Sequence, residues 1–200
     1  MVLEIIRYAR VIIFHNLVLP LTLLVAATTM VSADGRSSIN DEELKSLFDN
    51  LLHTQSAIDA NATSQKIWKI WTNDSDTEFG LSTMVKGVNL MNSNSLVAAD
   101  KLFSNLVKSS PQYIEAWNKR ATVRYLLGHF DSSLDDVNVV LSKEPNHFGA
   151  LSGLGLIMLQ KKDFEGALSA YKRVLTINPF SIEALRLVPI LERRLYGKSI

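Results

Sequence analysis

The chain has 200 residues, of which 47% are hydrophobic and 20% are charged, so it is long enough to bury one core of moderate size. Its formal net charge of +1 gives no reason to expect a nucleic-acid partner. Cysteine is absent, which excludes disulfides, thiolate nucleophiles and cysteine-containing zinc sites. The four histidines are scattered without paired ligand spacing, so we expect no metal and no cofactor.

Residues 1–33 have the layout of a secretory signal peptide. Arg7 and Arg10 precede an apolar run over residues 11–31 that contains no charged residue. Small residues follow, up to Ala33, where a signal peptidase would need them. Cleavage after Ala33 would leave Asp34 as the first residue of a periplasmic or secreted protein.

An uncleaved membrane anchor is the alternative interpretation of this leader. Residues 11–33 are numerous enough to cross a hydrocarbon core, although His15, Asn16 and Pro20 weaken that interpretation. An organellar transit peptide ranks below both. In the two favoured cases the body of the protein leaves the cytoplasm, and residues 34–40 follow as a disordered spacer.

Three prolines mark an internal repeat, because Pro111, Pro145 and Pro179 are each 34 residues apart. Small residues recur 24 and 12 positions before each proline: Gly87, Ala121, Gly155, Ala99, Ser133 and Ala167. Bulky apolar residues recur eight and fifteen positions before it: Phe103, Val137, Tyr171, Leu96, Phe130 and Phe164. Small residues allow two antiparallel helices to approach closely, and bulky residues fill the space beside them. The proline opens the next unit because it cannot continue the preceding helix.

With these registers the chain resembles the tetratricopeptide repeat (TPR) family, whose 34-residue unit is a helix, a turn and a second helix. The resemblance implies an all-α fold, a right-handed α-solenoid of three TPR helix hairpins at residues 80–113, 114–147 and 148–181. Residues 115–122 and 144–155 also resemble a subgroup of exported bacterial TPR proteins of undefined activity. That resemblance adds the periplasm as the expected compartment.

Helix boundaries follow from the same register. In the second unit we predict helices over residues 114–127 and 131–142, with Asp131 as the N-cap of the latter. In the third unit the corresponding helices are expected over residues 148–160 and 163–176.

The flanks of the array are expected to close its exposed apolar ends. Residues 41–79 have apolar side chains at helical spacing and predict an irregular helix pair at the N-terminal end. Residues 182–200 predict a C-terminal capping helix, in which Pro189 indicates either a kink or a later helix start.

The TPR resemblance also implies a concave surface, lined by the first helix of each repeat, that holds a segment of another protein. Asn118 would supply an amide hydrogen-bonding group at its polar middle. The expected peptide-binding residues are Met84, Val88, Met91, Glu115, Asn118, Thr122, Tyr125, Ser152 and Leu156. Alternatively, the N-terminal helices cover the apolar end at Met84, Val88 and Met91, since exposed apolar strips need a partner.

Arg120 lies where the family normally buries an aliphatic residue, and a buried arginine must be paired. Asp135 or Asp136 is the expected partner, in preference to an anion site. The carboxylate clamp of some family members is not present at the corresponding positions. No phosphate loop, nucleophile elbow or metal motif is visible, so we expect a scaffold and no enzyme. A membrane-tethered assembly factor that keeps residues 1–33 is the alternative.

Overall fold

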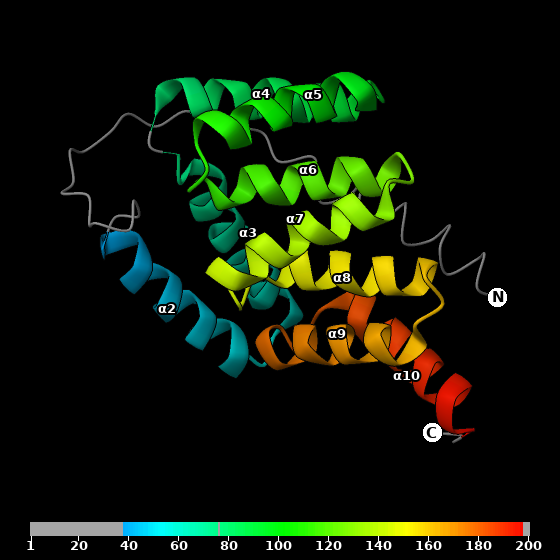
Figure 1. The fold of residues 1–200 in the computed structure, drawn as a ribbon. Helices are drawn as coiled ribbons and strands as arrows, with labels where there is room; N and C mark the ends of the chain where they lie inside the picture. The colour runs from blue at the N-terminus through cyan, green and yellow to red at the C-terminus, as the bar shows by residue number, and fades with distance from the viewer. Residues whose placement is uncertain (1–37, 76, 198–200) are drawn as a thin grey trace.

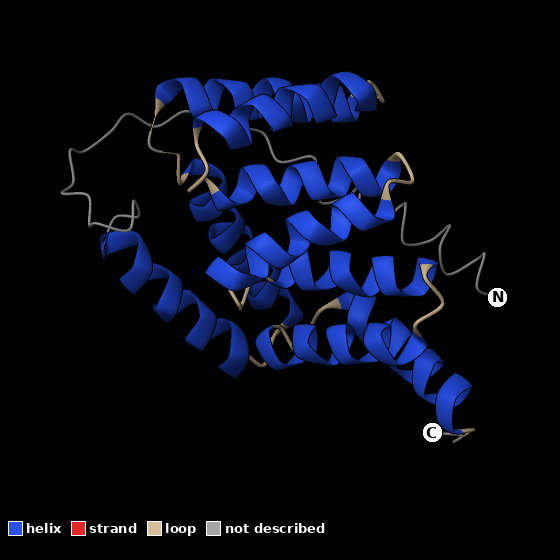
Figure 2. Cartoon of the chain, viewed as in Figure 1, coloured by secondary structure: helices blue, strands red, loops and turns tan. Residues whose placement is uncertain are grey.

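A computed structural model describes residues 38–75 and 77–197 of the chain. These residues form nine helices and no strand (Figure 2). The expected leader and residues 34–37 of the expected spacer lie outside the described residues. None of the described helices is long and apolar enough to cross a membrane.

Six of the helices pair into three antiparallel hairpins that stack side by side, with α4 against α5, α6 against α7 and α8 against α9 (Figure 1). The α-solenoid of helical hairpins predicted from the repeat is therefore confirmed. The helices are α2 (Ser38–His53), α3 (Ala57–Asn73), α4 (Glu78–Asn92), α5 (Leu96–Ser109), α6 (Ile114–Leu126), α7 (Phe130–Lys143), α8 (Phe148–Gln160), α9 (Phe164–Ile177) and α10 (Ile182–Tyr196).

Each hairpin turns through a residue in the left-handed conformation at one repeat position. Asn94, Gly128 and Lys162 have φ angles of 57°, 83° and 61°. The following backbone N–H donates in each case to a carbonyl five residues earlier, at 2.8, 2.8 and 2.9 Å. This bond satisfies a carbonyl that the helix end would otherwise leave unpaired. The three turns are therefore equivalent, although only Gly128 adopts this conformation without steric cost.

The two helices of each hairpin meet where a small residue faces a bulky one. Gly87 lies against the Phe103 ring and Gly155 against the Tyr171 ring, so closely that an added Cβ would be 2.4 and 2.7 Å from them. Phe103 and Tyr171 are fully buried. The equivalent pair in the second hairpin is Ala121 and Val137, in which a larger first residue accompanies a smaller second one. The repeat register thus encodes matched sizes across each hairpin.

Two boundaries differ from expectation, and the start of the last helix agrees with it. The prediction of Asp131 as an N-cap is wrong, because the tight turn at Gly128 lets the helix begin at Phe130 with His129 as its N-cap. Helix α2 begins at Ser38, inside the expected spacer, with Asp41 in its first turn, where a negative charge is favourable. Helix α10 begins at Ile182 and contains Pro189, which excludes the later start.

Helix α2 packs on the opposite end of the array from the one expected. Leu44, Leu47 and Leu51 of α2 are buried in one cluster with residues of α8, α9 and α10. Helix α2 contacts α9, and α3 runs back across the stack (Figure 1). The apolar stripe of α2 therefore covers the C-terminal repeat.

We expect Gly155→Ala to lower the free energy of unfolding by about 1 kcal/mol. Overpacking against the buried Tyr171 ring costs about 1–3 kcal/mol, and the better helix propensity of alanine returns up to about 1 kcal/mol. Gly153→Ala on the same helix is the control, since its Cβ would meet only Val137 at 3.8 Å. Urea denaturation should show that this control is more stable by about 0.5–1 kcal/mol. Equal changes in both variants would contradict the size-matching argument.

Candidate functional site

Helix α3 crosses the side of the array that carries the first helices of the repeats. Three contacts mark its path. Ser64 Oγ accepts a hydrogen bond from Asn178 Nδ2 at 3.2 Å, in the turn after α9. Further along, Trp68 and Trp71 contact Phe148 at the start of α8. Near its end, the Thr72 carbonyl accepts a hydrogen bond from the Tyr113 hydroxyl, next to the start of α6.

The aromatic rings in the last turns of α3 pack against the start of α8. The Trp71 ring stacks on His147, with the centroids 3.9 Å apart and the planes 9° from parallel. Trp68 lies edge-on to His147 and Phe148. It also lies so close to Gly149 that a Cβ there would be 2.3 Å from the ring. A glycine in the first helix of the third repeat therefore makes room for a tryptophan of α3.

Glu115 is a buried hub beneath these rings. Its carboxylate accepts hydrogen bonds from Asn118 Nδ2 at 3.0 and 3.2 Å and pairs with Lys119 Nζ at 2.9 Å. His147 Nδ1 accepts from the Ala150 backbone N–H at 3.1 Å, so Nε2 carries the proton and donates to Glu115 at 3.1 Å. Burial alone would raise the pKa of Glu115, but Lys119 and His147 outweigh it and lower the pKa to about 2.

Arg120 forms the structural ion pair that the sequence predicted, and the partner is Asp136. Its Nε and Nη2 donate to the two carboxylate oxygens at 2.9 and 2.7 Å. Arg124 Nη1 donates to the same carboxylate at 2.9 Å. Asp136 is buried, whereas Asp135 is exposed. The bidentate geometry accounts for the charge of Arg120 without an external anion.

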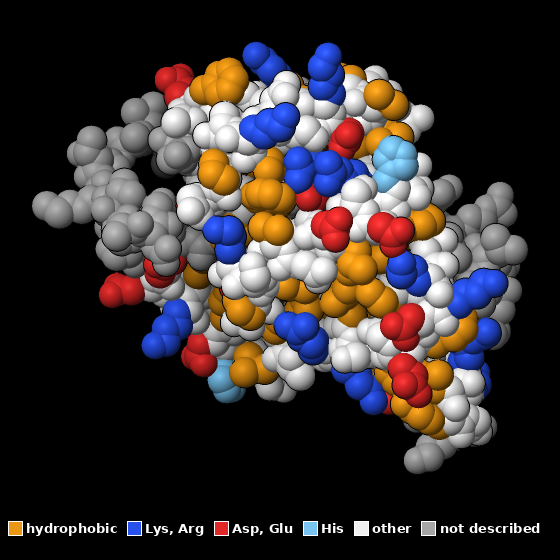
Figure 3. Space-filling model, in the orientation of Figure 1, with side chains coloured by type: hydrophobic (Ala, Val, Ile, Leu, Met, Phe, Trp, Pro, Cys, Tyr) orange, Lys and Arg blue, Asp and Glu red, His pale blue; other side chains and the backbone are white. Residues whose placement is uncertain are grey.

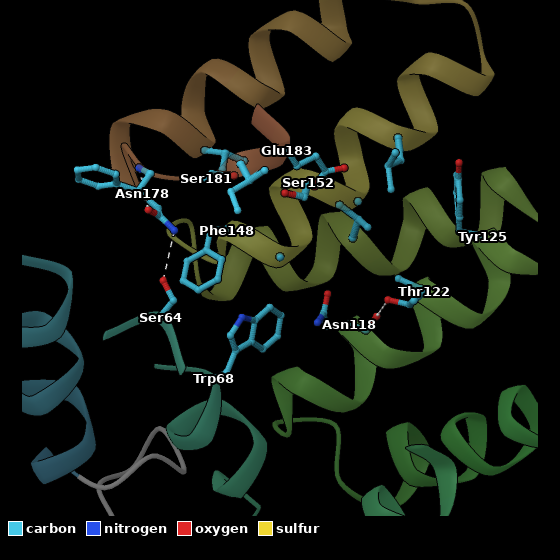
Figure 4. A pocket seen from close by; sticks show the side chains of 18 of the residues that line it. Ser64, Trp68, Asn118, Thr122, Tyr125, Phe148, Ser152, Asn178, Ser181 and Glu183 are labelled. Atoms are coloured by element: carbon cyan, nitrogen blue, oxygen red, sulfur yellow. Dashed lines mark hydrogen bonds between the residues drawn. The ribbon is translucent and has the colours of Figure 1, made fainter. Parts of the chain in front are cut away.

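A cavity of about 470 Å³ remains beside α3, bounded by α6, α8 and the beginning of α10 (Figure 4). Its volume falls within the range of small-ligand and side-chain pockets. Helices α6 and α8, the first helices of the second and third repeats, contribute Asn118, Thr122, Tyr125, Ser152, Gly153 and Leu156. Because Glu115 uses the amide nitrogen of Asn118, the amide oxygen is the atom turned toward the cavity (Figure 4).

The structure separates the nine predicted peptide-binding residues into two groups. Five of them line the cavity: Asn118, Thr122, Tyr125, Ser152 and Leu156. The other four do not. Met84 and Met91 are buried with Phe103 of α5 and Val123 of α6, and Val88 packs against the same cluster. Glu115 is fully buried in the hub described above. The predicted apolar end of the groove is thus part of the core, because α5 and α6 enclose these methionines.

Sequence reasoning missed several cavity residues, among them Ser64 and Trp68 of α3, Asn178 in the turn after α9, and Glu183 of α10. Glu183 could have been found. It stands four residues after Pro179, as Glu115 stands four residues after Pro111. Helix α10 therefore occupies the position of the first helix of a fourth repeat. The α3 residues lack any such register, and only the tertiary fold brings them to the cavity.

Charges on the face seen in Figure 3 are mixed in sign, with basic and acidic side chains interspersed. Two exposed ions illustrate the pattern, since Lys161 Nζ pairs with Asp131 at 2.6 Å. Within the described ranges, no three His, Asp or Glu side chains are grouped to hold a metal ion.

No family model matches the chain. It is 29% identical over 168 residues to a TPR repeat-containing protein of Rhizobium etli, covering 84% of this chain and 82% of the relative. Among solved structures it is similar to a MamA RS-1 ArsTM double mutant, with a TM-score of 0.54 and 17% identity over 78% of this chain and 84% of that one. A tetratricopeptide repeat protein from Parabacteroides merdae matches with a TM-score of 0.49 and 21% identity, over 77% of this chain and 59% of that one.

The stacked hairpins and the face crossed by α3 define a helical-repeat scaffold. The 34-residue register and the Rhizobium etli relative support the tetratricopeptide repeat family for this chain. Folds of this type generally mediate protein–protein interaction and are typically non-enzymatic.

In Glu115→Gln, the free energy of unfolding should depend less on pH in the acidic range than in the wild type. The folded-state pKa of Glu115, about 2, lies below the reference value of 4.5. The stabilisation from its carboxylate is therefore complete above pH 4.5 and is lost as the pH falls from 4.5 toward 2. The loss reaches about 3 kcal/mol for the wild type. Urea denaturation between pH 5 and pH 2.5 measures it, with the exposed Asp135→Asn as control. If the free energy of unfolding of Glu115→Gln fell with pH as steeply as that of the wild type, Glu115 would not be the source of the acid sensitivity.

Proposed function

We propose that this protein is an exported TPR scaffold that binds a segment of another protein in the cavity beside α3. The observation that carries the proposal is the cavity itself, about 470 Å³ left open on a face that α3 otherwise covers. Apolar walls at Leu156 and Phe148 would give affinity, and Thr122 and Ser152 would orient the bound chain.

Helix α3 supports the choice of a polypeptide ligand. It is a segment of chain that already lies across the first repeat helices and inserts Trp68 beside Gly149. A partner segment that continues along α6 and α8 would meet the same kind of surface, with Asn118 offering its amide oxygen. Proteins bind peptides in apolar grooves that carry a few polar groups, and the surface beside α3 has both features.

A binding role is favoured over catalysis by the way the acid–base groups are used. His147 and Glu115 are fully buried and hydrogen-bonded to each other. The second nitrogen of His147 accepts the Ala150 N–H, and Lys119 pairs with Glu115. The hydrogen-bonding atoms of these groups are thus used within the fold.

Gly153→Leu is expected to abolish partner binding by filling the cavity. Gly153 lines it, and the nearest neighbour of an added Cβ is Val137 at 3.8 Å, so the larger side chain enters open space. A photo-crosslinking residue at Thr122 should capture a partner in native extracts, and one at exposed Lys101 of α5 should not. Gly153→Ala is the matched control and should keep the crosslink. Equal capture in Gly153→Leu, with its helix content unchanged by circular dichroism, would contradict the proposal.

Export is proposed from residues 1–33, where Arg7 and Arg10 precede an uncharged apolar run. The periplasm is the compartment that the subgroup resemblance favours. The second candidate is a membrane-tethered assembly factor, supported by the length of the apolar run, which suffices to cross a bilayer.

Cleavage after Ala33 predicts a mature protein that begins at Asp34. Small residues at the cleavage position are what the peptidase requires. Mass spectrometry of the protein isolated from its native cells would identify this terminus in the soluble fraction. An intact residue 1–33 segment in the membrane fraction would instead establish the tethered form.

A further inference from the structure

Glu183 places a carboxyl group in the cavity with no cation beside it. The Tyr171 hydroxyl donates to its Oε1 at 3.2 Å, and Ser152 is a second hydroxyl partner. Figure 4 shows Glu183 and Ser152 next to each other at the wall formed by α8 and α10. Among the ion pairs of the described residues, none includes Glu183. Both hydrogen-bond partners are therefore neutral.

The repeat register gives an internal comparison for this carboxyl group. Glu115 and Glu183 each follow a repeat proline by four residues, and both begin a helix on the same side of the array. Glu115 has Lys119 one turn later, whereas Glu183 has the buried Leu187 at that position. One glutamate is thus neutralised within the fold, and its equivalent faces a cavity with that neutralising group missing.

Within residues 38–75 and 77–197, no other charged group that lines the cavity replaces the missing cation. Lys119 of α6 lines the cavity, but its ammonium group is 2.9 Å from Glu115 and lies over the Trp68 ring. The lining residues of α3 are uncharged. On α10 itself, Arg186 is exposed to solvent. From α9 comes only the Tyr171 hydroxyl, and burial together with Glu183 raises the pKa of that phenol.

We propose that the cavity receives a lysine or arginine side chain of the bound protein, whose cationic group pairs with the Glu183 carboxylate between α8 and α10. This inference rests on the proposed function and names the chemistry that the partner must present. Burying an ionised carboxylate without a cation is unfavourable, because the group loses its hydration. A cation inside the cavity would offset that loss. The apolar stem of either side chain would lie along Leu156 and Phe148.

The protonation of Glu183 makes the interaction depend on pH in a defined direction. Burial raises the pKa of this carboxyl to about 7, although Tyr171 and Ser152 oppose the rise. A cation binds the ionised form, so affinity should increase as the pH rises through 7. Between pH 6 and pH 8 the ionised fraction grows about tenfold, and the dissociation constant should fall by about the same factor.

The test uses the full-length protein and two probes of the same shape, N-acetyl-lysine N-methylamide and N-acetyl-norleucine N-methylamide. NMR titration should show the lysine probe shifting the Ser152 and Glu183 resonances. Its dissociation constant should be about tenfold lower at pH 8 than at pH 6. The norleucine probe should bind more weakly at pH 8 and show no pH dependence.

Glu183→Gln keeps an acceptor for the Tyr171 hydroxyl and removes the charge, so it should bind the two probes equally at both pH values. The variant should also unfold no more easily than the wild type at pH 8. The reason is that the raised pKa makes the ionised carboxyl a cost to the folded state as the pH rises from 4.5 through 7.

Equal binding of both probes to the wild type, or an unchanged preference for lysine in Glu183→Gln, would overturn the inference. These failures differ from a failure of the proposed function. If Gly153→Leu loses its crosslinked partner while the lysine probe shows no preference, the cavity binds protein without a cation. If the lysine probe binds as expected and Gly153→Leu keeps its partner, the pocket for a cation lies outside the partner interface, and the inference fails as stated.

Discussion

The architecture depends on how closely the two helices of each repeat approach one another. Gly87 and Gly155 lie against the rings of Phe103 and Tyr171, and the middle hairpin reaches a similar fit with Ala121 and Val137. A methyl group added at either glycine would have to displace a buried ring. The close approach lets each hairpin present its first helix to one side, and the aligned first helices create the face on which α3 and the cavity lie.

The N-terminal helices make that face into a site of limited size. Trp71 stacks on His147 and Trp68 occupies the gap at Gly149, so part of the concave surface becomes core. What remains open lies between α3, α6, α8 and α10. A complete groove along the array would accept long segments in several registers. The cavity left beside α3 instead favours a short contact with a defined position, because its walls come from four helices at once.

Two buried carboxylates of the described residues are matched by cations inside the fold. Asp136 is matched by Arg120 and Arg124, and Glu115 is matched by Lys119 and a histidine that donates to it. Each arrangement uses nearly every donor and acceptor it contains, as the interior of a protein requires. Glu183 has only hydroxyl partners and an open space in front of it. Unlike Asp136 and Glu115, Glu183 has no cation among its hydrogen-bond partners, and the proposed partner would supply one.

The hairpins could be predicted from the sequence because they follow from local spacing: prolines every 34 residues, small residues opposite bulky ones, and an arginine that needed an acid. Extending that spacing past the third repeat would also have led to Glu183. The tertiary contacts place Met84 and Met91 in the core and pack α2 on the last repeat, with α3 running across the array. Those outcomes depend on which apolar surfaces meet across the chain. Residue spacing records neighbours within one hairpin, whereas the path of α3 is set by contacts such as Ser64 with Asn178, which are far apart in sequence.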